Sequence, residues 1–203
     1  MPLVLLPACC AVCGGGGEVV CTTCAADLAP APSLAVPLHL DSCRALYAYD
    51  DLTRALLIRL KNRHRRDAVA WLADRLAAAG SPVAGGVVTW APTSTMRRRR
   101  RGFDQAELLA RAVARRWGLP VQPLLRRLPG PAQSGRSAAE RRHNPAFAVG
   151  HSVVQAVVVV DDVITTGATI TAAARALRAA GAAGVHATVA ARARSPRGRR
   201  AAA

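Results

Sequence analysis

The stretch from Val157 to Thr169, VVVVDDVITTGAT, constrains the fold more than any other part of the chain. Four consecutive valines are typical of a strand that is buried on both faces, as in a parallel sheet covered by helices. Asp161 and Asp162 follow directly, and a threonine-rich turn leads into an alanine-rich segment. Backbone N–H groups at the start of a helix favour an anion. The stretch therefore predicts two carboxylates beside an anion-binding turn.

Two acids next to such a turn suit a ligand with both hydroxyls and a phosphate, such as a ribose 5-phosphate. A nucleotide-binding P-loop does not fit, because its G-x-x-x-x-G-K-[ST] pattern needs a lysine that this stretch lacks. The order of strand, two acids and T-T-G-x-T resembles the 5-phosphoribosyl-1-pyrophosphate (PRPP) signature of type I phosphoribosyltransferases. The alternative is a buried strand capped by polar turn residues, which explains the valines but not the whole pattern.

The rest of the chain alternates between strand and helix patterns. Strands are expected at 47–49 and 185–190, and a strand followed by a turn at 85–92; helices are expected from about 53 to 76, from about 106, and from 170 to 180. This order predicts an α/β fold with a parallel sheet flanked by helices. The resemblance to the PRPP signature implies that this sheet is type I phosphoribosyltransferase-like. We expect a zinc-binding segment and linker at 1–45, the main domain at 46–191 and a basic disordered tail at 192–203.

Two C-x-x-C pairs stand near the start of the chain, Cys10 with Cys13 and Cys21 with Cys24, separated by a glycine run. Each pair can place two thiolates on one tight turn, and two such turns make a tetrahedral site for structural Zn²⁺. Plain reduced or redox-active cysteines are the alternative. Cys9 could replace Cys10 as a ligand, since the pattern is ambiguous by one residue. Four thiolates leave no open coordination position, so the site is assigned no catalysis.

Arginine dominates the charge of the chain, which carries 28 Lys+Arg against 12 Asp+Glu and a formal net charge of +16. Such a charge suits phosphate-rich partners, although a GC-rich genome would also raise the arginine content. Five arginines run from Arg97 to Arg101, between an expected strand and helix, where doubly wound folds bind ligands. Guanidinium groups there could bind pyrophosphate. Solvated charge or nucleic-acid contact is the alternative for this run, and for residues 61–66 a solvated turn competes with a basic rim.

Membrane insertion is not expected, because no apolar stretch reaches the ~20 residues that a spanning helix needs. The N-terminal segment lacks the positive n-region of a secretory signal, and the expected location is the cytoplasm. The polar stretch 133–147 precedes the valine strand. It is expected to be either a lid over an anionic substrate or an ordinary surface loop.

Taken together, these motifs resemble the ComF/GntX family of phosphoribosyltransferase-like proteins, linked to DNA uptake during competence. The resemblance rests on the C-x-x-C pairs, the L-x-x-L-K segment ending at Lys61, the RGFDQAELLA segment at 101–110, Gln133, and the 140–147 stretch. The family usually has Asn where Asp104 stands and an apolar residue near Arg136. Its V-P-x-P after the second strand is Trp90-Ala91-Pro92 here, and a second cysteine cluster of longer members is absent.

The resemblance implies a phosphoribosyltransferase core that binds PRPP together with Mg²⁺, within nucleoside metabolism or DNA uptake. Asp161 and Asp162 would contact the ribose hydroxyls, and Arg101 would face the leaving pyrophosphate. The remaining ligand contacts would come from Thr165, Thr166, Gly167, Ala168, Thr169, Gln133, Arg141 and Asn144.

Two functions stay open. One is an enzyme that transfers the phosphoribosyl group. The other is a non-catalytic module that binds single-stranded DNA, or competence or replication-restart proteins. The aromatic content of 3% argues against base stacking, so any DNA contact should involve the backbone. A nucleotide-regulated transcription factor ranks last, because we find no helix-turn-helix segment.

Overall fold

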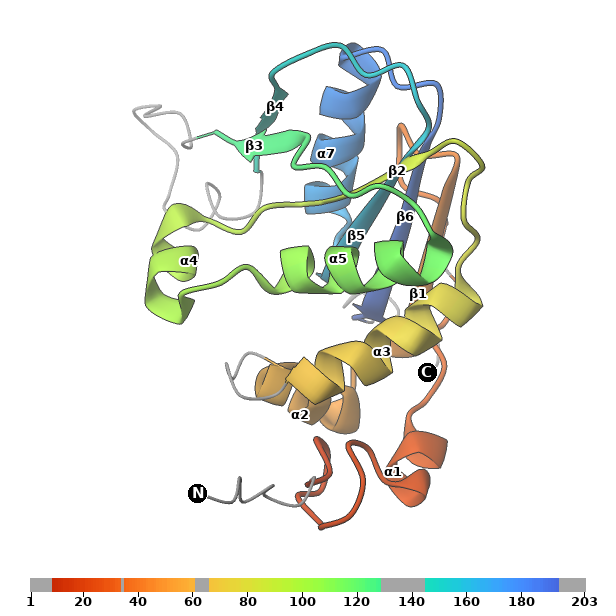
Figure 1. Ribbon diagram of the computed structural model, residues 1–203, viewed down its shortest axis with the longest axis vertical. Coiled ribbons are helices and arrows are strands. Elements are labelled where there is room, and N and C mark those ends of the chain that lie inside the picture. Colours follow the sequence, from red (N-terminus) through yellow and green to blue (C-terminus); the bar gives the residue numbers. More distant parts are fainter. Residues whose placement is uncertain (1–8, 34, 61–65, 129–144, 194–203) are drawn as a thin grey trace, which may run out of the picture.

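A parallel four-stranded sheet forms the centre of the computed structural model, which describes residues 9–33, 35–60, 66–128 and 145–193 (Figure 1). Its strands lie in the order β1-β6-β5-β2, with bounds Ser42–Ala48, Val185–Arg192, Val157–Ile164 and Val87–Trp90. The central strand β5 pairs with β2 from Val87↔Val157 to Trp90↔Val160. Asp161 is therefore the first residue of β5 beyond the last pair with β2.

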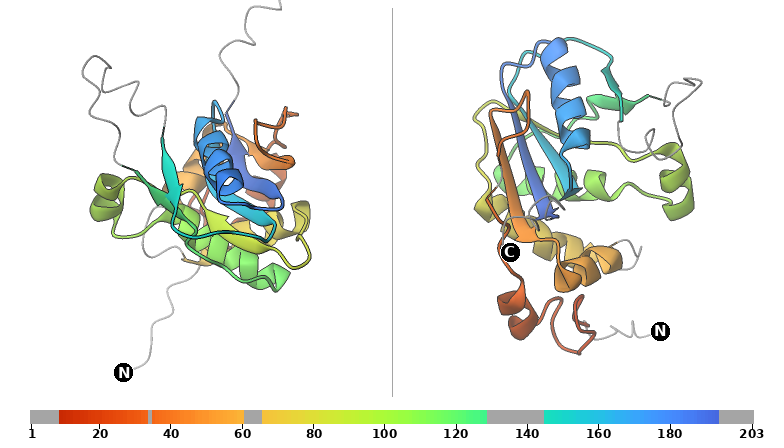
Figure 2. Two further views of the ribbon diagram at one scale, coloured as in Figure 1. Left: turned by 90° about the horizontal axis from the view of Figure 1, so that it is seen from above. Right: turned by 180° about the vertical axis from the view of Figure 1, so that it is seen from behind.

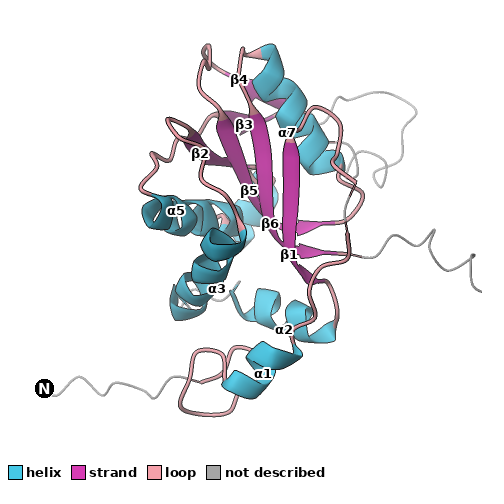
Figure 3. Ribbon diagram, turned by 90° about the vertical axis from the view of Figure 1, so that its right-hand side faces the viewer, coloured by secondary structure: helices cyan, strands magenta, loops and turns pink. Residues whose placement is uncertain are grey.

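Helices cover both faces of this sheet, as the valine run predicts (Figures 2 and 3). Helix α7 (Ala168–Ala179) packs on one face, over Val157 and Val159. Helices α2 (Asp51–Leu60), α3 (Arg66–Ala79) and α5 (Gln105–Trp117) pack on the other, over Val158 and Val160. All four valines are fully or almost fully buried. The expected α/β fold, a parallel sheet flanked by helices, is thus confirmed.

A short antiparallel ribbon lies beside α7, made of β3 (Leu125–Arg127) and β4 (Phe147–Val149). Near the N-terminus, α1 (Thr22–Asp27) and the cysteine-bearing turns lie against α2 and share its hydrophobic core through Val12, Val20 and Leu28 (Figure 1). None of the described helices has both the length and the apolar character that crossing a bilayer requires.

Several elements differ from their sequence-based bounds, and the helical pattern expected from about 53 to 76 belongs to two helices, α2 and α3. Strand β1 begins at Ser42, not at 47, because its backbone pairs with β6 from Ser42↔His186 onward, so the sheet includes residues assigned to the linker. The arginine run lies in a separate helix, α4 (Thr95–Arg101), which the Ser94 side chain caps by accepting from Arg97 N–H. Strand β6 continues to Arg192, the first residue of the predicted tail, and residues 194–203 lie outside the described residues.

Candidate functional site

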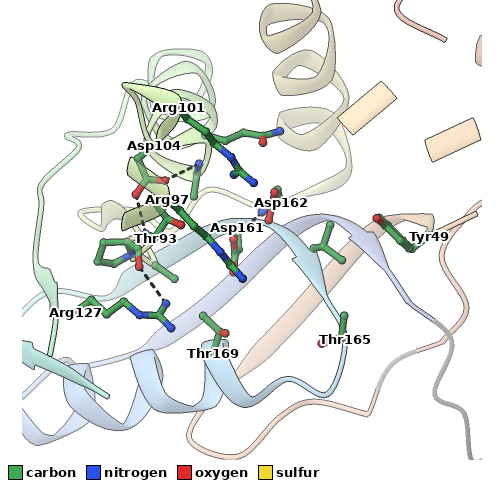
Figure 4. A pocket seen from close by; sticks show the side chains of 15 residues that line it. Tyr49, Thr93, Arg97, Arg101, Asp104, Arg127, Asp161, Asp162, Thr165 and Thr169 are labelled. Atoms are coloured by element: carbon green, nitrogen blue, oxygen red, sulfur yellow. Dashed lines mark hydrogen bonds between the residues drawn. The ribbon is translucent and has the colours of Figure 1, made fainter. Parts of the chain in front are cut away.

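A cavity of about 460 Å³, the sheet-edge cavity, lies where β2 and β5 end next to each other (Figure 4). Loops that follow parallel strands converge at this edge, and open α/β sheets bind ligands there. The volume falls within the range of small-molecule sites, roughly 300–1,000 Å³. Its polar lining residues come from six separate segments: Tyr49, Thr93, Arg97, Arg101, Asp104, Gln105, Arg127, Asp161, Asp162, Thr165 and Thr169.

Asp161 and Asp162 both line this cavity, although Asp161 is only 9% exposed. Burial raises the pKa of Asp161 well above its usual value, and the neighbouring charge of Asp162 raises it further. The backbone N–H of Asp162 donates to Asp161 Oδ1 at 2.8 Å, which offsets part of this effect. A hydroxyl donor or a cation in the cavity would stabilise the carboxylate form of Asp161.

The turn after β5 lines a second cavity of about 370 Å³, the turn cavity, which is bounded by residues 163–170 and Arg97. Gly167 has φ of +79° and directly precedes α7, and a residue with a side chain rarely adopts that conformation. Thr165 and Thr169 line both cavities, whereas Thr166, Gly167 and Ala168 line only the turn cavity. The predicted anion-binding turn thus lies directly beside the two aspartates.

Three arginines line the sheet-edge cavity. Arg97 and Arg101 extend from α4 into the space above the two aspartates (Figure 4). Arg127 comes from β3, where Nη1 donates to the Pro92 carbonyl at 3.4 Å and the guanidinium lies 5.7 Å from the centre of the Phe147 ring. Burial lowers the pKa of Arg127, and the charge of Arg97 adds to this effect. A phosphate group would relieve the repulsion between these cations.

Asp104 has a structural role at the rim of the cavity. Its Oδ1 accepts from Ala106 N–H at 3.1 Å and caps α5, and its Oδ2 accepts from Thr93 N–H at 2.8 Å. Burial raises the pKa of Asp104 although these bonds oppose the rise. The residue therefore ties the loop after β2 to the start of α5, and both carboxylate oxygens are already used within the protein.

The structure thus brings together Asp161, Asp162, Arg101 and the turn 165–169, all of which the sequence predicts as site residues. Gln133, Arg141 and Asn144 lie outside the described residues, as does the stretch 133–147 except for its last three residues, of which Phe147 begins β4. Sequence reasoning assigned no role to Tyr49, Thr93, Gln105 or Arg127. Gln105 follows shortly after the arginine run, within the 101–110 segment, but Arg127 lies in a three-residue strand without a detectable pattern.

Four cysteines meet near the N-terminus, where the sulfur atoms of Cys10, Cys13, Cys21 and Cys24 all lie within 4.8 Å of one another. The sulfurs of Cys13 and Cys21 are 3.9 Å apart, close to the ~3.8 Å expected for tetrahedral Zn–S bonds of about 2.3 Å. Cys9 is exposed and is not part of this group. The geometry therefore favours Cys10 over Cys9, and the four residues fit a structural zinc ion.

Backbone N–H groups already point at these sulfurs. Cys10 Sγ accepts from Val12 and Cys21 N–H, and Cys13 Sγ accepts from Gly15 N–H, each at 3.4 Å. Burial would raise the pKa of the Cys10 thiol, but backbone hydrogen bonds outweigh it and lower the pKa to about 6. The hydrogen bond with the Cys21 thiol, together with burial, raises the pKa of Cys24 to about 12. A divalent cation would stabilise all four thiolates together.

The second half of the chain matches a known protein family. Residues 104–202 match the family described as phosphoribosyl transferase domain, and this range contains β5, the turn and α7. The second half of the chain is therefore similar to a phosphoribosyltransferase domain. No curated protein matches the chain.

Several solved structures are similar in part. The glutamine PRPP amidotransferase of B. subtilis, complexed with ADP and GMP, is 25% identical with a TM-score of 0.44. A structure described as the allosteric regulatory enzyme of purine biosynthesis is 27% identical, also with a TM-score of 0.44. In each case the match covers 62% of this chain, which spans 26% of that protein's length. Adenine phosphoribosyltransferase from Leishmania tarentolae is 16% identical with a TM-score of 0.38, covering 69% of this chain and 74% of that one.

Proposed function

We propose that this chain binds PRPP, or a closely similar phosphorylated ribose, in the sheet-edge cavity. The observation that carries the proposal is that carboxylates and phosphate-binding groups line the same cavity. Carboxylates of Asp161 and Asp162 can accept hydrogen bonds from sugar hydroxyls. Arginines and the threonine turn can donate to phosphate oxygens nearby. The match of residues 104–202 to the phosphoribosyl transferase domain supports the same ligand class.

In this arrangement the 5-phosphate lies in the turn cavity, where it accepts from the backbone N–H groups and hydroxyls of residues 165–169. The ribose hydroxyls donate to Asp161 and Asp162, and the pyrophosphate lies toward Arg97, Arg101 and Arg127. The two aspartates offer the oxygen ligands that Mg²⁺ prefers, and Mg²⁺ bound with the substrate would neutralise pyrophosphate charge.

Phosphoribosyl transfer is the reaction that such a site supports best. A nucleophile would form a bond to C1 of the ribose while the C1–O bond to pyrophosphate breaks, and pyrophosphate would leave with the bonding electrons. The aspartates would stabilise the positive charge that develops on the sugar, and the arginines would stabilise the departing oxygens. The acceptor is best sought among purines, pyrimidines and orotate by a pyrophosphate-release assay.

Calorimetry with PRPP and Mg²⁺ tests the binding step. A hydrogen bond to a charged group contributes about 1.5–3 kcal/mol, so Asp161→Ala combined with Asp162→Ala should weaken PRPP binding by at least about 100-fold. Glu107→Ala, which removes an acid from an exposed pair with Arg111 on α5, serves as the control and should bind as the wild type does. Equal PRPP affinity in the double variant and the wild type would overturn the proposal.

A structural role for Zn²⁺ belongs to the same proposal. The four-cysteine cluster (Cys10, Cys13, Cys21 and Cys24) would hold the ion and so hold the N-terminal turns against α2. The segment is too short to bury a core of its own, and metal binding would supply part of its folding free energy.

A second candidate function is binding of single-stranded DNA, in line with the resemblance to competence proteins. The observation in its favour is that α4 exposes Arg98 and Arg99 beside the sheet-edge cavity. Contacts to the DNA backbone would release counterions and depend steeply on salt. Fluorescence anisotropy with labelled oligonucleotides at salt concentrations between about 50 and 200 mM tests it. Binding that barely changes over this range would contradict this function.

A further inference from the structure

Gln105, the first residue of α5, lines the sheet-edge cavity but has no part in the binding scheme above. Its side chain is almost completely buried, with only 3% of the residue exposed. Buried amide groups in proteins are normally satisfied on both the oxygen and the nitrogen. The partners of this amide therefore indicate what Gln105 does.

The amide nitrogen has one partner, on the neighbouring helix. Gln105 Nε2 donates to the Leu57 carbonyl on α2 at 3.5 Å. Rotating the amide by half a turn would place Oε1 against that carbonyl, so that two acceptors would face each other with no hydrogen between them. Leu57 thus fixes the orientation, with the NH₂ group toward α2.

The amide oxygen in this orientation is unsatisfied. Gln105 Oε1 is buried and has no hydrogen-bond partner among the residues that the structure describes. A buried acceptor without a donor weakens the folded state, because the oxygen has lost water and gained nothing in return. Since Gln105 also lines the sheet-edge cavity, a ligand there can supply the missing donor once the side chain of Gln105 shifts to turn its buried Oε1 toward the cavity.

The chemistry of the cavity decides which ligand group can do so. Phosphate and pyrophosphate oxygens act mainly as acceptors near neutral pH and are poor donors to Oε1. Sugar hydroxyls can donate. We propose that Gln105 determines specificity by accepting, through Oε1, a hydrogen bond from a hydroxyl of the bound sugar phosphate. This inference rests on the proposed function, because it concerns the same ligand in the same cavity.

A neutral acceptor suits this position better than a third carboxylate. The charges of Asp162 and Asp104 already raise the pKa of Asp161, and a glutamate at 105 would add to that effect and repel pyrophosphate. Asp104 is less suited to the role, because Ala106 and Thr93 N–H already hold its two oxygens at the start of α5 and in the loop after β2. Gln105 therefore adds hydroxyl recognition without adding negative charge.

The substitution Gln105→Met tests the inference, because it keeps the side-chain length and removes both polar atoms. The probes are ribose 5-phosphate, 2-deoxyribose 5-phosphate and inorganic phosphate, titrated by calorimetry. We expect affinity for ribose 5-phosphate to fall about fivefold to tenfold, while affinity for inorganic phosphate stays within about twofold. The melting temperature of the free protein should be unchanged or higher, because the unsatisfied oxygen is gone.

The deoxy sugar identifies the hydroxyl. If 2-deoxyribose 5-phosphate binds equally to wild type and Gln105→Met, the 2-hydroxyl is the donor, and an equal loss with both sugars assigns the role to another hydroxyl. Gln122→Met is the matched control, since Gln122 is exposed and does not line the cavity, and it should bind all three probes normally.

Two results would overturn the inference and leave the proposed function intact. One is unchanged ribose 5-phosphate affinity in Gln105→Met. The other is a parallel loss of sugar phosphate binding, phosphate binding and melting temperature, which would make Gln105 a structural residue. Failure of the wild type to bind ribose 5-phosphate or PRPP would instead reject the proposed function and this inference with it.

Discussion

The four-cysteine cluster and the sheet-edge cavity each gather groups that need a partner from outside the protein, but they are assembled in opposite ways. The cluster takes all its sulfurs from one short segment, Cys10 to Cys24, folded back on itself. The cavity takes its lining from segments as distant in sequence as Tyr49, Arg127 and Asp161. The first depends mainly on local turns, whereas the second exists only when the whole sheet is formed.

The two regions also differ in how far the protein itself satisfies their polar groups. In the cluster, backbone N–H groups donate to the sulfurs of Cys10 and Cys13, and a cation would stabilise the four thiolates together. In the cavity, Asp161 is buried next to Asp162, and Gln105 Oε1 has no partner among the described residues. We infer that the cluster serves stability, while the cavity lowers the stability of the free protein in order to bind a ligand.

The largest effect is expected from breaking the cluster. Cys13 is exposed, so Cys13→Ser removes a zinc ligand with little loss of packing. Because structural zinc contributes about 10–16 kcal/mol in isolated finger peptides, we expect losing one ligand to cost roughly 3 kcal/mol or more here. For a chain of this length the melting temperature should fall by about 6 °C or more. Elemental analysis should find one zinc per wild-type chain and little in the variant.

Cys9→Ser is the matched control, since Cys9 is also exposed but lies outside the cluster. It should keep both the metal and the melting temperature of the wild type. If the wild type purified with zinc present holds no metal, or if Cys9→Ser loses as much as Cys13→Ser, the structural role assigned to the cluster is wrong.

In the cavity, by contrast, we expect a substitution to increase the free energy of unfolding. Asp161→Asn keeps an oxygen that can accept from Asp162 N–H but removes the buried charge. Since the pKa of Asp161 is raised on folding, its ionisation weakens the folded state as pH rises through the folded-state pKa. The variant should therefore gain roughly 0.5–2 kcal/mol at pH values where wild-type Asp161 is charged. This gain should disappear at acidic pH, while PRPP binding is lost.

Thermal melts of both proteins between acidic and mildly alkaline pH measure this effect. Asp162→Asn is a useful comparison, because it removes the neighbouring charge and should also ease the ionisation of Asp161. A stability gain that does not depend on pH, or a loss that grows as pH rises, would contradict the idea that the cavity holds Asp161 at a cost to folding.

The same contrast explains how much could be predicted from sequence. Cys10, Cys13, Cys21 and Cys24 form a spacing pattern within one segment, and Asp161 to Thr169 follow one strand, so each set could be recognised from local sequence. Arg127 and Tyr49 reach the cavity only because β3 packs beside α7 and β1 ends at the same sheet edge. No local pattern contains that information.

Gln105 and α4 show a second limit of prediction from sequence. Gln105 stands within a segment that the sequence comparison singled out, yet its importance appears only from the carbonyl of Leu57 and the unsatisfied Oε1. From the sequence, the arginine run predicts only a concentration of positive charge, because five like charges in succession do not indicate a helix. The Ser94 cap and the left-handed Gly102 that define its ends become meaningful only in the folded chain.

The smallest effect is expected where the two regions approach each other through α2. Arg59 Nη1 donates to the Cys10 carbonyl at 2.8 Å, and two residues earlier on the same helix Leu57 accepts from Gln105. Arg59→Met should cost about 1 kcal/mol of stability, the contribution of one hydrogen bond. Zinc content and PRPP affinity should not change, because Leu56, Leu57 and Leu60 hold α2 in the core independently of Arg59.

Arg54→Met, at an exposed position on the same helix, is the control and should leave stability, zinc content and PRPP affinity unchanged. A fall in PRPP affinity in Arg59→Met but not in Arg54→Met would show that α2 couples the cluster to the cavity, and the two regions would then have to be treated as one cooperative unit.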